Sequence, residues 1–167
     1  MLVAGVVGLA VQRLLELRLS RRNERRLRAK GAIERGAGHY PAMVAIHVLW
    51  LASTLVEGLV RGPQIPAWWP VPLAAFVLVQ PLRYWAILSL GENWNVRVLV
   101  VPGRKLVMSG PYRYFPHPNY VAVAVEVLSF PLIFGAWLTA VVFSALNAAF
   151  LYVRIREEER ALTELAG

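Results

Sequence analysis

Five long apolar runs dominate this sequence and restrict what it can fold into. They cover residues 1–19, 41–60, 67–90, 118–134 and 136–153. Each is near the roughly 20 residues that a helix needs to cross the hydrocarbon of a bilayer. A helix also satisfies its own backbone hydrogen bonds inside lipid. The pattern predicts an all-α integral membrane protein with about five transmembrane helices.

The segments between the runs are basic, and they alternate with poorly charged ones. Seven Lys or Arg residues lie in residues 20–40, four in 91–117 and three from 154 onward, whereas the other side of a five-span topology holds only Arg61. Basic residues gather in cytoplasmic loops. The charges therefore predict a multi-pass protein of the cell membrane, with its N-terminus outside and its C-terminus in the cytoplasm.

The basic net charge of +8 accompanies a mean hydropathy of +0.50. Nucleic-acid binding is the other interpretation of such a charge. Apolar runs of this length disfavour a small soluble nucleic-acid reader, so membrane lipids are predicted as partners and nucleic acid is not. We expect a single domain over residues 1–167, with N-terminal spans in 1–66 and a cofactor-binding core in 67–167.

The first run carries charges of its own. Gln12, Arg13 and Glu16 must face protein or water if residues 1–19 span the bilayer. Four spans, with residues 1–19 lying on the membrane surface, are the alternative. Residues 20–40 are expected to form a loop, because Gly residues interrupt this stretch. Residues 96–101 read as a short β-like segment.

The densest candidate site is residues 104–120, RKLVMSGPYRYFPHPNY. Gly110 and Pro111 predict a tight turn. Prolines on both sides of His117 are expected to hold it extended rather than helical. Such a segment could present an imidazole and tyrosine rings at a membrane face. The plainer interpretation is a helix entry with interfacial tyrosines.

Charged side chains in the later runs add to this picture. Arg154 and Glu158 are four residues apart and share a face of a helix, although a solvated helix end would show the same spacing. Glu126 lies at membrane depth, where an acid is a functional candidate by default. It could face a substrate path or bond to a polar residue such as Asn147. Glu57, near the outer interface, is expected to be solvated.

No metal site is predicted. The chain has no cysteine, and His39 and His47 lie eight residues apart without a third ligand nearby. Polar contacts between helices are the expected role of both histidines.

Three ordered blocks resemble the isoprenylcysteine carboxyl methyltransferase family. They are Gly110-Pro111-Tyr112, then His117-Pro118-Asn119-Tyr120 before a helical hairpin, then Arg154-Ile155 with Glu158-Glu159 and Leu162. The resemblance covers roughly residues 75–165. Pieces of the N-terminal part, among them Gln12-Arg13, Gly31 to Glu34 and His39-Tyr40, are similar to bacterial alkylpyrone O-methyltransferases that work beside type III polyketide synthases.

The resemblance implies S-adenosylmethionine as cofactor and a set of residues that hold it. The implied cofactor contacts are Lys105, Leu106, Val107, Tyr112, His117, Pro118, Asn119, Tyr120 and Glu158. Arg154 is implied as the catalytic, substrate-side cation, and we expect Glu126 on the acceptor's path as a second catalytic residue. The chain departs from the family at Arg104, where the family often has His, and at Pro116, where it has Arg.

The function implied is O-methylation of a lipophilic acceptor that arrives from the bilayer. An alkylpyrone or alkyl-phenolic lipid is the first choice, with a possible functional association with a type III polyketide synthase, and an isoprenylcysteine-type carboxylate is the second. Two alternatives stay open. One is an NADPH-dependent membrane reductase related to sterol reductases, and the other is a non-catalytic membrane scaffold.

Overall fold

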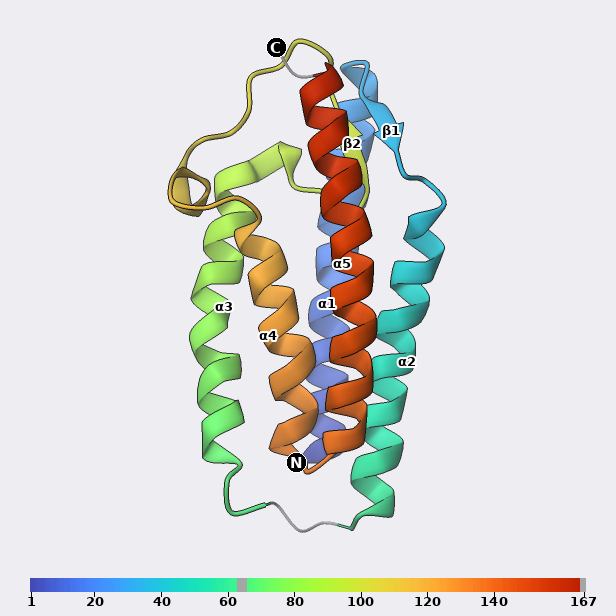
Figure 1. The fold of residues 1–167 in the computed structure, drawn as a ribbon, viewed down its shortest axis with the longest axis vertical. Coiled ribbons are helices and arrows are strands. Elements are labelled where there is room, and N and C mark those ends of the chain that lie inside the picture. Colours follow the sequence, from blue (N-terminus) through green and yellow to red (C-terminus); the bar gives the residue numbers. More distant parts are fainter. Residues whose placement is uncertain (63–65, 166–167) are drawn as a thin grey trace.

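The computed structural model of the protein describes residues 1–62 and 66–165, and these form a helical bundle (Figure 1). The five long helices are α1 (Leu2–Ala29), α2 (His39–Val60), α3 (Pro70–Leu90), α4 (Pro118–Ile133) and α5 (Trp137–Leu165). Two short strands, β1 (Ile33–Arg35) and β2 (Val98–Val100), and two 3-10 turns, η1 (Gly91–Asn93) and η2 (Gly110–Arg113), lie in the connections. The predicted all-α membrane architecture is confirmed, with one small strand pair added.

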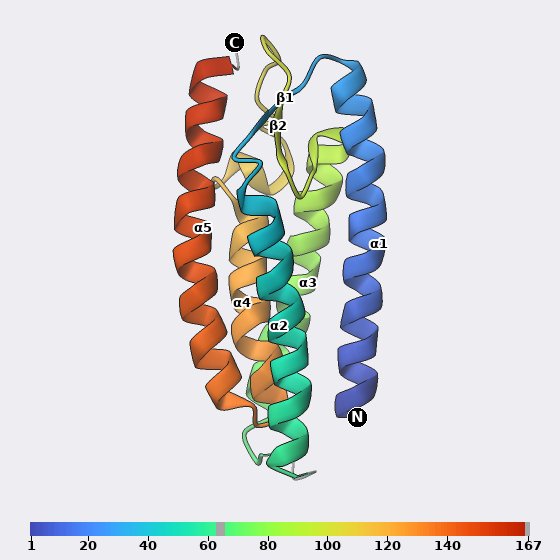
Figure 2. The ribbon, with the colours of Figure 1, turned by 90° about the vertical axis from the view of Figure 1, so that its right-hand side faces the viewer.

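Within the described residues, three segments are long and apolar enough to cross a membrane, namely Tyr40–Val60, Pro70–Asn93 and Trp137–Leu165. α4 is apolar but has 16 residues, and α1 has 28 residues that include charges. Both run along the long axis of the bundle beside the other helices (Figures 1 and 2). This placement favours α1 as part of the bundle over a helix lying across it, while the count of five spans stays a prediction.

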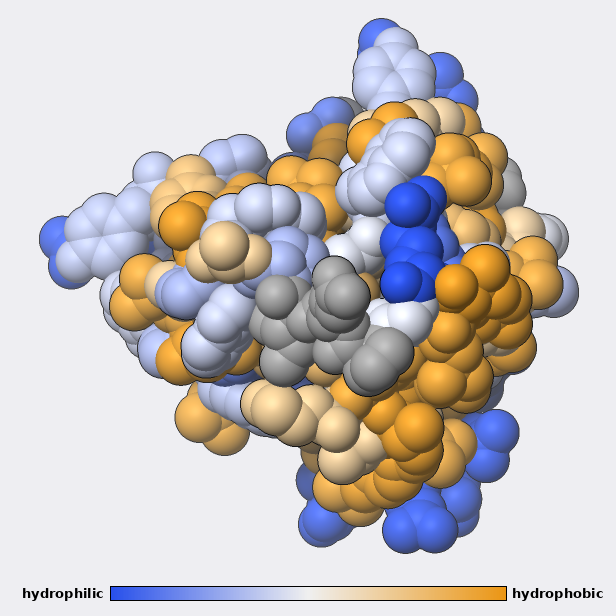
Figure 3. Space-filling view, turned by 90° about the horizontal axis from the view of Figure 1, so that it is seen from below, coloured by the Kyte–Doolittle hydropathy of each residue, from blue (hydrophilic) through white to orange (hydrophobic). Residues whose placement is uncertain are grey.

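The basic segments meet at one end of the bundle. Consecutive helices alternate in direction, so the end of α1, the β1–β2 pair and the end of α5 lie together (Figures 1 and 2). In the view of the opposite end in Figure 3, hydrophobic residues dominate the right and lower parts, polar residues are mixed in on the left, and a compact strongly hydrophilic patch lies near the middle. The predicted grouping of basic segments on one side is confirmed, and their cytoplasmic location remains a prediction.

The predicted loop over residues 20–40 is wrong in its first half, because α1 continues to Ala29. Residues 20–29 contain arginine, leucine and alanine, which favour helix, and the first glycine after residue 20 is Gly31. Buried Asn23 fixes this extension by donating to the carbonyls of Gly91 (3.1 Å) and Trp94 (2.7 Å). Local helix propensity and these hydrogen bonds to a distant segment together account for the extension of α1.

β1 and β2 pair antiparallel, with Ile33 opposite Val100 and Arg35 opposite Val98. The β-like stretch expected over residues 96–101 therefore contains a strand. Burial raises the pKa of Glu34, but hydrogen bonds from Arg97 and Arg28 outweigh this and hold the pKa below its usual range. The strand pair links the 20–40 and 91–117 segments.

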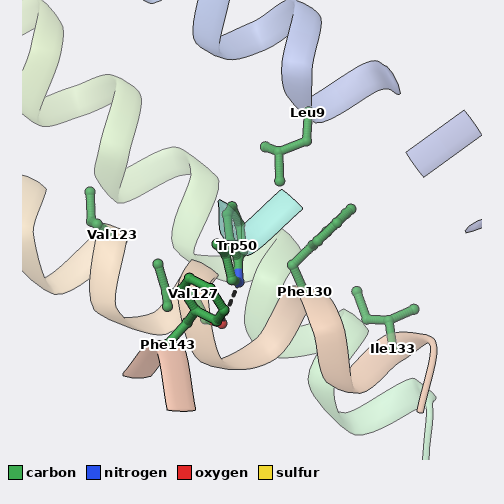
Figure 4. Packing of buried hydrophobic residues seen from close by; sticks show 7 residues of the cluster. All are labelled: Leu9, Trp50, Val123, Val127, Phe130, Ile133 and Phe143. Atoms are coloured by element: carbon green, nitrogen blue, oxygen red, sulfur yellow. Dashed lines mark hydrogen bonds between the residues drawn. The ribbon is translucent and has the colours of Figure 1, made fainter. Parts of the chain in front are cut away.

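The buried side chains of the apolar core pack against one another between the helices (Figure 4). Its buried members come from four helices and comprise Leu9, Trp50, Val123, Val127, Phe130, Ile133 and Phe143. The Trp50 indole N–H donates to the Val127 carbonyl at 3.1 Å, so the largest buried ring leaves no polar atom unpaired. Outward side chains such as Leu78 and Leu88 are apolar and three-quarters or more exposed, as expected of a surface solvated by lipid.

The predicted hairpin of the last two helices is confirmed, and it turns at Gly135, whose φ is 74°. Glu57, expected to be solvated, instead accepts hydrogen bonds from the backbone N–H groups of Leu138 (3.1 Å) and Thr139 (2.7 Å). Free N–H groups at a helix start favour a carboxylate. Glu57 therefore ties α2 to the first turn of α5.

Candidate functional site

A cavity of about 480 Å³ opens at the basic end of the bundle. Its walls are the η1–β2 connection, β2, the segment from 104 to 117, the start of α4 and the end of α5. Pockets of roughly 300–1,000 Å³ suit a ligand of drug or cofactor size. Of the implied residues, the lining includes Lys105, Leu106, Val107, Tyr112, His117, Asn119, Tyr120, Arg154 and Glu158.

A buried tyrosine connects the two charged residues of α5. Arg154 Nε donates to the Tyr120 hydroxyl oxygen at 2.8 Å, and the Tyr120 hydroxyl donates in turn to Glu158 Oε2. Arg154 is only 7% exposed, and its other contact in this region is Met43 Sδ at 3.5 Å. A fixed cation and a fixed carboxylate thus share one wall of the cavity, as their i, i+4 spacing predicted.

His117 lies beside this trio in a strained backbone conformation. Its φ of 60° and ψ of 38° are left-handed, and it is the one non-glycine with positive φ in the described ranges. The expectation of an extended His117 is therefore wrong. A following proline disfavours the right-handed helical region, and the chain takes the left-handed one instead of the extended one. Strain of this kind is enriched at functional sites.

The turn puts the His117 ring against Tyr120, with ring centroids 5.3 Å apart and planes inclined by 14°. His117 Nε2 is 3.3 Å from Glu159 Oε1. Both contacts hold the imidazole toward the end of α5. The αL turn therefore goes with an imidazole that contacts Tyr120 and Glu159 and lines the cavity.

The predicted tight turn at Gly110 and Pro111 is confirmed as the start of η2. Gly110 has a φ of 60°, and an added Cβ would lie 1.9 Å from Ser89 Oγ of α3. Glycine is therefore required both by conformation and by close packing. Burial raises the pKa of the Tyr112 phenol, and the nearby Glu158 carboxylate raises it further, so Tyr112 is a neutral hydroxyl at neutral pH.

Asn119 carries a buried side-chain oxygen, Oδ1, without a hydrogen-bond partner. Buried acceptors are normally paired, because leaving one unpaired costs roughly 1–3 kcal/mol. Asn119 also borders the cavity. An N–H donor on a bound molecule would satisfy this atom.

Two of the predicted residues lie outside the cavity lining. Pro118 is the buried first residue of α4 and restricts the backbone of His117, the residue before it. Glu126 lies fully buried farther along α4. Its predicted catalytic role stays a prediction without a contact to the cavity.

Glu126 belongs to a buried ion cluster that joins three helices, instead of bonding to Asn147. It accepts hydrogen bonds from Arg13 of α1 and from Gln80 and Arg83 of α3. Glu16 accepts from the same two arginines. Two cations and two carboxylates balance one another, which is how charges persist at membrane depth.

Of the two histidines considered for a metal, His47 Nδ1 lies 2.9 Å from the Met43 carbonyl oxygen and its ring meets Trp50 edge-on. Both contacts lie within α2, so the expected polar contact between helices is not what the structure shows for His47. The side chain of His39 lies outside what the structure describes.

Sequence reasoning missed much of the cavity wall. The lining residues outside the predicted site include Leu90, Asn93, Trp94, Arg97, Leu99 and Val101. Most lie between residues 90 and 104, whose position depends on strand pairing with β1. The β-like stretch after Val96 is the sequence signal that could have predicted this wall. It directly precedes the 104–120 segment, so a strand there would lie next to the candidate site.

Comparison with known proteins agrees with this geometry. A profile described as "Isoprenylcysteine carboxyl methyltransferase (ICMT) family" matches residues 72–164, the part that builds α3, the cavity and the α4–α5 hairpin. The chain is 45% identical over 156 residues to the uncharacterized protein YpbQ of Bacillus subtilis, with 93% of each chain covered. It is 28% identical over 154 residues to an uncharacterized protein of Haemophilus influenzae, covering 92% of this chain and 90% of that one.

No solved structure matches the chain significantly. The family match covers more than half of the sequence and contains the Arg154–Tyr120–Glu158 trio together with the His117 turn. The protein belongs to the isoprenylcysteine carboxyl methyltransferase family.

Proposed function

We propose that this chain transfers a methyl group from S-adenosylmethionine to an oxygen of a lipophilic acceptor at the cytoplasmic membrane face. The observation that carries the proposal is the Arg154–Tyr120–Glu158 trio on the cavity wall. It places a rigid cation and a rigid carboxylate, bridged by one buried hydroxyl, at the basic end of the bundle, which the distribution of Lys and Arg predicts to be cytoplasmic.

The lining chemistry fits such a cofactor, which bears an ammonium, a carboxylate, a purine and a sulfonium. Glu158 and Glu159 offer carboxylates, Lys105 offers a cation, and the unpaired oxygen of Asn119 offers an acceptor. Tyrosine and histidine rings are available for stacking or for contact with a cation. When bound, the cofactor supplies an electrophilic methyl group on sulfur.

The residues of the chain mainly align the methyl donor with the acceptor oxygen and shield both from water. An acidic enol or a carboxylate is already largely ionised near pH 7, so the site needs no strong general base. Arg154 would orient the acceptor's anionic oxygen through charge-assisted hydrogen bonds. Tyr112 stays protonated and does not compete as an anion. Holding the two partners in line supplies much of the rate enhancement.

For the acceptor we propose an alkylpyrone or alkyl-phenolic lipid first and a prenylated cysteine carboxylate second. A type III polyketide synthase would supply the former. The apolar lining residues Leu106, Met108 and Phe115 give the cavity a lipid-compatible side. Glu126 does not line the cavity, and its role on the acceptor's path stays a prediction.

The test is methyl transfer by the purified protein in nanodiscs, with radiolabelled S-adenosylmethionine and each acceptor class in turn. We expect label in one acceptor class, and Arg154→Gln to reduce transfer at least about 100-fold, as expected when a fixed charge contact is lost. The Arg156→Gln control, an exposed arginine of the same helix, should retain activity. Stabilisation by NADPH but not by S-adenosylhomocysteine would overturn the proposal in favour of a reductase, and stabilisation by neither would favour a scaffold.

A further inference from the structure

Five arginines form one exposed face at the basic end of α1. They are Arg18, Arg21, Arg22, Arg25 and Arg26, called here the arginine face. With 3.6 residues per turn, the five fall within an arc of about 140°. They point away from the cavity, since the inward residues of the same turns are buried Ser20, Asn23 and Leu27.

The arginine face has no anionic partner among the residues that the structure describes. None of its five members forms an ion pair or a side-chain hydrogen bond within residues 1–62 and 66–165. Both acids of α1 are engaged elsewhere, Glu16 with Arg13 and Arg83, and Glu24 with Arg28 and Arg97. By contrast, Arg28, Arg97 and Arg104 all pair with carboxylates. Five cations without an anionic partner are thus gathered on the outer side of α1.

The arginine face continues an apolar face of the same helix. Val7, Val11, Leu14 and Leu15 are each about half exposed and lie on the same arc, one to three turns earlier. α1 stands at the edge of the bundle in Figure 2, so this side turns away from the other helices. This side of α1 is apolar first and cationic later along the helix. Its apolar part could contact the acyl chain of a lipid while its cationic part contacts the headgroup of the same lipid.

Helix length puts the arginines at headgroup depth. The 28 residues of α1 span about 42 Å. The hydrocarbon core is about 30 Å thick, and about 40–45 Å with the headgroup regions. At 1.5 Å per residue, Arg21, Arg22, Arg25 and Arg26 lie about 28–36 Å from the start of α1, at the edge of the hydrocarbon and in the headgroup region, and Arg18 lies about one turn earlier.

We propose that the arginine face binds the headgroups of anionic phospholipids such as phosphatidylglycerol. The guanidinium groups supply paired N–H donors that match phosphate oxygens. Phosphatidylcholine offers the same phosphate, but its choline cation cancels the charge. The site is separate from the cavity, and the inference does not depend on the proposed methyl transfer.

The experiment measures which lipids remain bound. Protein is released from nanodiscs of equal phosphatidylcholine and phosphatidylglycerol, and retained lipids are counted by native mass spectrometry. We expect enrichment of phosphatidylglycerol by about fivefold or more, which falls in 0.5 M NaCl because salt screens such contacts. Arg22→Gln/Arg26→Gln should abolish most of the enrichment, and Arg22→Lys/Arg26→Lys should keep most of it.

Arg156→Gln/Arg160→Gln is the matched control. It removes the same charge, with the same spacing, from exposed positions of α5 at the same end of the bundle. We expect this variant to bind lipids like the parent protein. Absence of enrichment in the parent protein, or equal loss in both double variants, would overturn the proposal. Melting temperatures in neutral detergent show whether each variant still folds. The Lys variant, which keeps the charge, shows whether lipid binding depends on that charge.

Discussion

The Tyr120 hydroxyl organises the charged wall of the cavity, because it accepts from Arg154 and donates to Glu158. Removing it in Tyr120→Phe leaves both charges without their buried partner. Hydrogen bonds to charged groups contribute about 1.5–3 kcal/mol. We therefore expect S-adenosylhomocysteine to bind about 10- to 100-fold more weakly, measured by calorimetry in detergent.

Tyr152→Phe is the matched control, since the Tyr152 hydroxyl also contacts an arginine of α5 but is exposed to the exterior. Equal affinities in the parent protein and Tyr120→Phe would contradict the organising role of this hydroxyl.

His117 tests whether backbone strain at the site is real. Its αL conformation costs about 1–2 kcal/mol for a residue with a Cβ. Both His117→Gly and His117→Ala remove the ring, so they lose the same contacts to Tyr120 and Glu159. Since only glycine is unstrained here, we expect His117→Gly to melt at a higher temperature than His117→Ala. The reverse order, normal for a residue inside a helix, would show that the turn is not strained.

Among the helices, α1, α3 and α4 are joined by the ion cluster around Glu126. Replacing one member of a buried ion pair typically costs about 3–5 kcal/mol, because the partner charge stays buried. We expect Glu126→Gln to destabilise the bundle by this order in mixed-micelle unfolding. Arg13→Gln/Glu126→Gln should be less destabilised than the sum of the single variants. Two results would contradict a structural role of the cluster. One is a double variant whose loss of unfolding free energy equals the sum of the single losses, and the other is a loss in Glu126→Gln no larger than in the exposed Glu164→Gln.

The β1–β2 connection makes the basic end sensitive to acid. Glu34 has a folded-state pKa below its usual value near 4.5, so its ion pairs stabilise the fold above that pH. As the pH falls through the lowered pKa, protonation removes this stabilisation. We expect the melting temperature of the parent protein to fall between pH 6 and pH 3 more steeply than that of Glu34→Gln. If the melting temperatures of the parent protein and Glu34→Gln fell in parallel with pH, the stabilising role of the Glu34 ion pairs would be contradicted.

The helices were predictable where hydrophobic length alone decides them, as in α2, α3 and the α4–α5 hairpin. The extension of α1 to Ala29 was not, since it depends on Asn23 reaching the carbonyls of Gly91 and Trp94. The partners of Glu126 were equally hidden, because they lie 43 to 113 residues away in sequence. Local patterns carry no information on which distant polar groups meet.

For the site, sequence motifs placed His117, Tyr120, Arg154 and Glu158 around one cavity. The backbone of His117 was misjudged, because a residue before proline has two allowed regions and the choice depends on packing. The wall from residues 90 to 104 was missed for a related reason. It contains few reactive side chains, and its position is fixed by pairing with β1.

At the scale of the whole molecule, the bundle has one basic end, and the charge asymmetry predicts that this end faces the cytoplasm. The cysteine-free chain allows a direct check with single cysteines at two exposed positions. In intact cells, a membrane-impermeant maleimide should label Val60→Cys. Met108→Cys should react only after permeabilisation. The reverse pattern would invert the topology and place the cavity where S-adenosylmethionine is not made.

The central claim is that the cavity at the basic end holds a methyl donor, and binding of S-adenosylhomocysteine to the purified protein tests it most directly. Calorimetry in detergent should give a saturable, one-to-one isotherm for the parent protein and for the exposed-carboxylate control Glu164→Gln. Glu158→Gln should weaken binding by about 10-fold or more, as expected for a charged contact. Absence of binding to the parent protein, or unchanged binding by Glu158→Gln, would contradict the claim.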